Sequence, residues 1–240
     1  MWRRRFLKRS SRTCTEGEDD AAVNGRILVI AAHPDDELLG CGATVCKRVA
    51  MGDEAHVLIL CEGETMRSQS HAVKRLATLS AAKILGTAEP VCAGLPDQHL
   101  DAIPIVDVIR PIEEMVERVQ PGMVLCPFGA DLNRDHQLVY EAAMVSLRPK
   151  FASVEEIYAY YTVGSTEYAT ARVFRPDMYE CFDQATLRRK LEAFACYEME
   201  ALRYPNPRSA EGLTNLARFF GNQCCSEYAE AFETVRRIAR

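Results

Sequence analysis

Residues 26–42 read RILVIAAHPDDELLGCG, which places a buried strand, a charged turn and the start of a helix in one short segment. The run 26–32 is continuously apolar, as in strands that are covered on both faces of a parallel sheet. From residue 38 to 51 apolar residues recur at helical spacing, and Gly52 ends the helix. The segment therefore predicts an α/β domain whose first strand runs into a cluster of charges.

The alternation of strand and helix continues through the first two thirds of the chain. Further strands are predicted at 55–61, 90–95 and 123–127, and further helices at 70–85, 105–119 and 136–147. This order predicts a mostly parallel sheet with helices on both of its faces.

The last third of the chain has a different pattern. Residues 154–163 and 172–182 have the composition of strands, and residues 186–203 and 209–237 are mainly helical in character. Because no repeat or low-complexity linker interrupts the chain, we expect a single domain over 25–240 with a helical C-terminal part. Residues 1–24, a basic stretch followed by an acidic one, are expected to form a disordered leader.

Composition narrows the class of protein. The 240 residues are 48% hydrophobic and 26% charged, as in soluble globular proteins, and the net charge of -5 argues against nucleic acid as a partner. No apolar run has the length of a signal peptide or a transmembrane helix, and the 10 cysteines are typical of buried thiols in a reducing cytoplasm. The basic residues at 1–12 leave a weak prospect of contact with a membrane surface. Composition does not determine the oligomeric state, and it is compatible with a homo-oligomer.

Two polar clusters follow predicted strands. The first, HPDDE at 33–37, comes directly after the strand 26–32, and the second, DLNRDH at 131–136, follows the strand 123–127. In open α/β sheets, ligands bind beyond the carboxyl ends of the strands. We therefore expect the two clusters to face one crevice.

The residue types in these clusters suit a metal site. Zn²⁺ favours imidazole and carboxylate ligands, and His33, Asp36 and His136 offer three of them. Asp35 is then left beside the metal as a free carboxylate, suited to act as the general base on a bound water.

Simpler explanations exist for each residue taken alone. An acid in the first turn of a helix is often only favourable dipole chemistry, Asp131 or Asn133 is suited to cap a helix, and His136 is suited to start one. Three adjacent acids after His-Pro at the end of a buried strand repel one another, however, and this favours a bound cation.

The chain resembles the PIG-L (LmbE-like) family of zinc deacetylases from about residue 26 to residue 237. The resemblance rests on AAHPDDELLGCG, DLNRDH, LGTAEPVCAGLPDQHLD, YPNPRS and EYAEAFE. It implies a Rossmann-like sheet and one Zn²⁺, or another divalent metal, held by His33, Asp36 and His136, with Asp35 as the base. It also implies a small-molecule substrate: an N-acetylated amino sugar, either free, nucleotide-linked or part of a glycoside.

Some positions depart from the family pattern or concern the substrate. Many members carry a histidine where this chain has Asn133, a neutral donor that remains suited to bind an oxyanion, and a glutamate is common where this chain has Ala77. The residues expected on the substrate side are Arg67, Asp97, Asp131 and Arg208, the last as a partner for an anionic group such as a phosphate.

Two other classes of function are considered. One is an inactive relative that binds a sugar or a metal without hydrolysis; the intact set of metal residues argues against it. The other is a nucleotide-binding module, which is disfavoured because Gly40-Cys41-Gly42 lies within the helix and acids occupy the turn where phosphates would bind.

Overall fold

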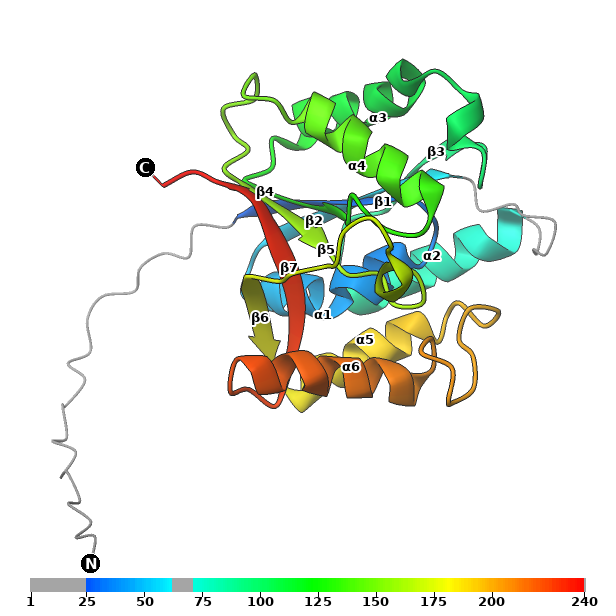
Figure 1. The fold of residues 1–240 in the computed structure, drawn as a ribbon, viewed down its shortest axis with the longest axis vertical. Helices are drawn as coiled ribbons and strands as arrows, with labels where there is room; N and C mark the ends of the chain where they lie inside the picture. The colour runs from blue at the N-terminus through cyan, green and yellow to red at the C-terminus, as the bar shows by residue number, and fades with distance from the viewer. Residues whose placement is uncertain (1–24, 62–70, 240) are drawn as a thin grey trace, which may run out of the picture.

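The computed structural model describes residues 25–61 and 71–239 (Figure 1). They form a seven-stranded sheet in the order β3-β2-β1-β4-β5-β7-β6. The strands are β1 (Arg26–Ala31), β2 (Glu54–Cys61), β3 (Val91–Leu95), β4 (Met123–Pro127), β5 (Glu156–Tyr160), β6 (Met178–Phe182) and β7 (Tyr228–Arg237). β1 to β5 pair in parallel, and β7 lies antiparallel between β5 and β6. The predicted α/β class with a mostly parallel sheet is confirmed.

Helices cover both faces of the sheet. They are α1 (Asp36–Ala50), α2 (His71–Leu85), α3 (Ile105–Val119), α4 (Arg134–Ser146), α5 (Gln184–Phe194) and α6 (Ala210–Gln223), with short 3-10 turns at Leu100–Ala102 and Thr166–Tyr168. In Figure 1, α3 and α4 lie on one side of the sheet, and the other α-helices lie on the opposite side. No helix within the described ranges is long and apolar enough to cross a membrane.

The apolar run of β1 explains why the sheet is buried from both sides. Ile27 and Val29 belong to the core that packs under α1, α2 and α5, whereas Leu28 and Ile30 belong to the core under α3 and α4. Successive side chains of a strand point to opposite faces, so a strand between two helical layers must be apolar at every position.

The C-terminal third corrects the sequence-based prediction in three places. The segment predicted as helical over 209–237 is helical only in α6, and its end forms β7. The strand predicted over 172–182 is limited to β6, and the helix predicted over 186–203 ends at Phe194. β7 reads YAEAFETVRR, in which alanine, glutamate and arginine favour helix locally. Pairing on both sides with β5 and β6 overrides that preference.

β7 also holds the helix that carries the first polar cluster. α1 is irregular at Cys41, where φ is -145° and ψ is 17°. Around this point, Glu230 of β7 accepts a hydrogen bond from the backbone N–H of Ala43 at 3.0 Å, and Lys190 of α5 donates to the carbonyl of Leu39 at 3.2 Å. Glu230 and Lys190 are themselves paired at 2.6 Å, and both are buried. The start of α1 is thus fixed by residues far away in the sequence.

Candidate metal centre

The turn between β1 and α1 has an unusual backbone. Asp35 precedes the first residue of α1 at φ 116° and ψ -27°, a region that residues other than glycine rarely adopt. The backbone N–H of His33 donates to Oδ2 of Asp36 at 2.9 Å, and the N–H groups of Leu38 and Leu39 both donate to the carbonyl of Asp35 at 2.9 Å. Backbone strain of this kind persists where surrounding bonds over-determine it, and it is concentrated at functional sites.

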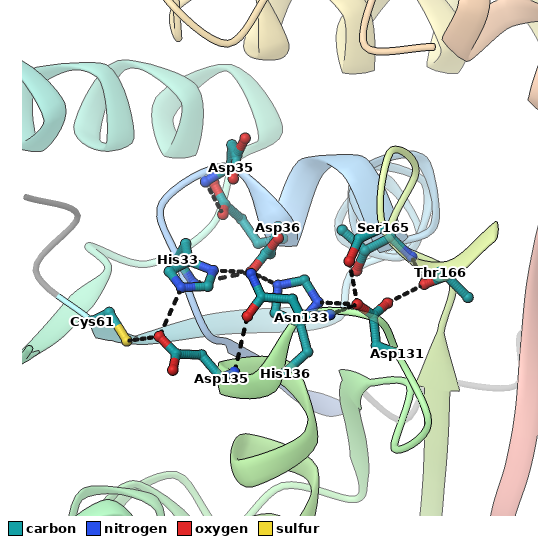
Figure 2. Close-up of polar contacts among 12 residues, drawn as sticks. His33, Asp35, Asp36, Cys61, Asp131, Asn133, Asp135, His136, Ser165 and Thr166 are labelled. Carbon is teal, nitrogen blue, oxygen red and sulfur yellow. Dashed lines mark hydrogen bonds and ion pairs between the residues drawn. The ribbon is translucent and has the colours of Figure 1, made fainter. Parts of the chain in front are cut away.

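The second cluster reaches the first because β4 lies beside β1. Asn133 caps α4 by accepting a hydrogen bond from the backbone N–H of Asp135 at 2.9 Å, and His136 follows in the first turn. Nε2 of His136 lies 3.1 Å from Oδ2 of Asp36, and Nδ1 of His33 lies 3.3 Å from the same oxygen. Figure 2 shows these three side chains pointing toward one another. The structure therefore brings the three predicted ligands together.

Each imidazole is held from behind by a carboxylate. Nε2 of His33 lies 3.1 Å from Oδ2 of Asp135, and Nδ1 of His136 lies 3.1 Å from Oδ1 of Asp131. Metal-ligating histidines typically donate their second N–H to such a partner, which orients the ring and leaves the other nitrogen free to bind the metal. The two nitrogens that face Asp36 are the free ones in this arrangement. Among the described residues, this donor set fits a divalent cation.

Charge is concentrated in this site. Burial alone would raise the pKa of Asp36, but the imidazoles of His136 and His33 outweigh it and hold this pKa well below the ordinary value. Burial disfavours charged imidazoles, yet carboxylates raise the pKa of His136 to about 9 and that of His33 well above its ordinary value. Without a metal, protons on the two imidazoles balance the negative charge of the carboxylates. A bound metal would replace those protons.

A second group of ligand types shares His33. Cys61 lies 3.7 Å from Oδ2 of Asp135, so His33, Cys61 and Asp135 also come within reach of one another. Burial raises the pKa of the Cys61 thiol to about 11, which keeps it protonated as a donor to Asp135. Zinc binds the thiolate, so the group formed by His33, Asp36 and His136 is the better metal site.

Asp35 has a different environment from Asp36. Its Oδ2 lies 3.1 Å from a guanidinium nitrogen of Arg208, which also lies 3.3 Å from Glu200. Burial raises the pKa of Asp35 well above its ordinary value, and Arg208 opposes that rise. The backbone N–H of Asp35 donates to Glu37 at 3.0 Å. Asp35 is therefore a buried carboxyl group that lies outside the ligand triad and pairs with Arg208.

Glu37 supports the turn from the core side. The hydroxyl of Tyr197 donates to Oε1 of Glu37 at 2.7 Å, while Oε2 accepts from the backbone of Asp35. Burial raises the pKa of Glu37 to about 7. No pattern in the sequence pointed to Tyr197, which lies in the segment after α5.

A cavity of about 150 Å³ opens over the site. Its walls include His33, Asp36 and His136 and the predicted residues Asp35, Asp97, Asn133 and Arg208. Asp97 also lies 3.3 Å from Nε2 of His33. The predicted residue Asp131 is instead buried behind His136, where the hydroxyls of Ser165 and Thr166 and the backbone N–H of Asn133 donate to it. Arg67 lies outside the described residues.

Some wall residues were not foreseen from the sequence. They are Lys74, Gln98 and Glu200. Asp135, which contacts His33 from behind, was not foreseen either. Gln98 donates from its backbone N–H to Oδ2 of Asp135 at 2.8 Å. The one signal in the sequence was the position of Asp135, directly before a candidate ligand in DLNRDH.

Comparisons with known proteins agree on the fold and the family. A curated relative, the uncharacterized deacetylase YaiS of Escherichia coli K12, is 27% identical over 70% of this chain and 87% of its own. N,N'-diacetylchitobiose deacetylase from Pyrococcus horikoshii superposes with a TM-score of 0.70 at 22% identity, over 88% of this chain and 84% of that chain. The hydratase GalB from Pseudomonas putida superposes with a TM-score of 0.69 at 22% identity, over 90% of this chain and 98% of that chain. The fold thus carries both deacetylases and a hydratase, and does not by itself decide the reaction. The family model described as PIG-L, GlcNAc-PI de-N-acetylase, matches residues 28–147, half of the chain, and the chain therefore belongs to the PIG-L family.

Proposed function

We propose that the protein is a metal-dependent N-deacetylase that cleaves the acetamide of an N-acetylated amino sugar into acetate and a free amine. One observation carries the proposal. Ligand atoms of His33, Asp36 and His136 all lie within 4.8 Å of one another, and Asp35, a carboxyl group outside this triad, lines the same cavity. Membership of the PIG-L family supports the same reaction.

His33, Asp36 and His136 would hold the metal, and Zn²⁺ suits two imidazoles and one carboxylate. When bound, the ion would lower the pKa of a water to ~7 and polarise the acetyl carbonyl. Asp135 and Asp131 would keep the two ligating nitrogens free of protons by accepting from the opposite side of each ring.

Asp35 would act as the general base. Its buried carboxyl group can take the proton of the attacking water and pass it to the departing amine, so one residue serves as base and acid. A pKa raised by burial suits both halves of this cycle, since the group must hold the proton and then release it. Arg208 opposes the rise and favours the ionised form that a base requires.

Asn133 would stabilise the charge that develops on the acetyl oxygen. Its Oδ1 is engaged as the cap of α4, which leaves its side-chain N–H₂ as the group available to the cavity. A neutral amide donates a hydrogen bond but supplies no proton, so this role is electrostatic.

The cavity suits an uncharged sugar better than a phosphate. Of the described residues in its walls, four are carboxyl groups and two are cationic side chains, and one of the cations, Arg208, already faces Asp35 and Glu200. We therefore assign Arg208 to Asp35 rather than to an anionic substrate group, and Asp131 to the orientation of His136. Asp97 remains our candidate for a sugar hydroxyl, and Arg67 remains a prediction from the sequence.

Acetate release tests the proposal directly. The full chain loaded with Zn²⁺ is assayed against free, glycosidic and nucleotide-linked N-acetylhexosamines. Asp35→Asn is expected to retain the metal and lose nearly all turnover, while Asp101→Asn, an exposed carboxylate in the 3-10 turn at Leu100–Ala102, keeps full rate. Near-normal turnover of Asp35→Asn sinks the mechanism. Metal and sugar binding without acetate release from any of these compounds favours the inactive binding module instead.

A further inference from the structure

A second and larger pocket adjoins the metal cavity. It measures about 350 Å³ and lies between α2 and the segment that follows α5. Pro34, Lys74 and Glu200 line both spaces, so the two lie directly beside each other. In Figure 1, the chain after α5 returns toward α2 on the side of the sheet opposite α3 and α4.

Most of the residues that line this pocket are apolar or aromatic, and its polar groups come from Lys74, Ser80, Glu198 and Glu200. α2 contributes Val73, Leu76 and Ala77, and the segment after α5 contributes Cys196 and Met199. Val73, Leu76 and Met199 are 44%, 64% and 59% exposed, which is high for large apolar side chains gathered around one hollow. Exposed apolar surface that is concentrated in this way marks a site for a ligand or partner.

α2 presents this surface because its opposite face is used by the core. Ala81 and Leu85 belong to the core, and Thr78 and Ala82 are also buried. Side chains three positions apart share a helix face, so Val73 and Leu76 form an edge of α2 that the described part of the chain leaves exposed. Ala77, which is half-buried and packs against the core, lies beside them.

The position of the pocket indicates what it binds. Pro34 belongs to the same turn as His33 and Asp35, and Glu200 contacts Arg208, which contacts Asp35. A molecule with its acetamide at the metal centre would extend its far end past Pro34 into the apolar space. The metal cavity alone, at about 150 Å³, is smaller than the ~300–1,000 Å³ of ordinary small-molecule sites, and the adjoining 350 Å³ supplies the difference.

We infer that this pocket binds an apolar alkyl or aryl aglycone joined to the amino sugar, so that the substrate is an N-acetylated glycoside with a hydrophobic group. The inference rests on the proposed deacetylase function. It adds a substrate class to that function and assigns specificity to α2 and the segment after α5.

A series of glycosides tests the pocket. The metal-loaded full chain is assayed with methyl, butyl and hexyl glycosides of N-acetylglucosamine. Each methylene that leaves water is worth about fourfold in binding, so two buried methylenes give more than tenfold, and kcat/KM should rise by at least that factor from methyl to hexyl. Because the group is remote from the reacting bond, the gain should appear as a lower KM at nearly constant kcat.

Three variants distinguish binding in the pocket from nonspecific hydrophobic binding. Ala77→Phe fills the space from α2 and should abolish the gain in kcat/KM from the methyl to the hexyl glycoside. Ala185→Phe makes the same change at an exposed position in the first turn of α5 and should preserve the gain. Leu76→Glu places a charge at an exposed position, which avoids strain in the core, and should also reduce the gain. Equal kcat/KM for methyl and hexyl glycosides in the unmodified protein overturns the inference and leaves the proposed function standing.

Binding without hydrolysis keeps the two proposals apart. Hexyl and methyl β-glucosides, which carry no acetamide, are titrated by calorimetry below micellar concentration. If no N-acetyl sugar is deacetylated, the proposed function fails. Tighter binding of the hexyl compound that Ala77→Phe removes would still establish the apolar site, and equal binding of both compounds would refute it.

Discussion

The contact between Arg208 and Asp35 leads to a sharp prediction about pH dependence. Replacing Arg208 with methionine removes the cation that pairs with the proposed base among the described residues, and it keeps a side chain of similar length. The guanidinium favours the ionised carboxylate, so its loss raises the pKa of Asp35. A base that stays protonated to higher pH shifts the acid limb of the kcat/KM profile upward.

The size of this effect follows from the geometry. Unit charges 3.1 Å apart at an effective dielectric of ~20 interact by about 5 kcal/mol, a ceiling of about four pH units. Arg208 shares its charge with Glu200 at 3.3 Å, and its side chain is 24% exposed, so water and Glu200 weaken the effect. We therefore expect the acid limb to move by about one to three pH units, within the range found for acids beside arginine.

The assay is the pH dependence of acetate release by the metal-loaded enzyme between pH 5 and 10. At a pH below both acid limbs, kcat/KM falls about tenfold for each pH unit by which the limb moves, while the rates converge at high pH. Arg208→Lys keeps a charge and should move the limb less. Arg110→Met, at an exposed position of α3, serves as the matched control. An acid limb that does not move refutes the reasoning. A rise in KM with an unchanged pH profile would instead indicate that Arg208 contacts the substrate.

Three further predictions concern the metal and the scaffold. Because the metal-free pKa of His136 is about 9 and that of His33 is also raised well above its ordinary value, zinc must displace at least one proton at neutral pH. Its affinity, measured in competition with a chromogenic chelator, should therefore fall at least tenfold from pH 8 to pH 7, and a flat profile speaks against His136 as a ligand. Glu230→Leu should cost about 3–5 kcal/mol in urea unfolding because it strands buried Lys190 and leaves the backbone N–H groups of Ala43 and Thr44 without their acceptor. Adding Lys190→Met should recover only the part of the loss that comes from the unpaired ammonium, and an additive double variant contradicts the pairing. Gly40→Ala places a Cβ 2.2 Å from the buried ring of Tyr160 in β5 and should lower the free energy of unfolding by about 1–3 kcal/mol. Gly122→Ala, whose Cβ has its nearest neighbour at 4.0 Å, should leave thermal stability almost unchanged. Equal effects of the two substitutions would exclude the clash.

Much of the site is readable in the sequence because its parts are local. The run 26–32 is apolar at every position, and this pattern predicts a strand buried on both faces. HPDDE follows it directly, and DLNRDH follows another predicted strand, so the rule that parallel strands end at one edge suffices to bring them together. The distance of 3.1 Å between His136 and Asp36 agrees with that expectation.

The α/β class, the two clusters and their meeting point could therefore be read from the chain alone, since each depends on periodicity or on adjacency along it. Three features needed the folded molecule: that β7 is a strand, that Glu230 steadies α1 and that Arg208 faces Asp35. β7 has the local composition of a helix, and its state depends on two neighbouring strands. Arg208 and Asp35 are separated by 173 positions and lie at no strand end that they share, so no periodic pattern links them. Packing alone brings such pairs together, and here it sets the charge beside the proposed base.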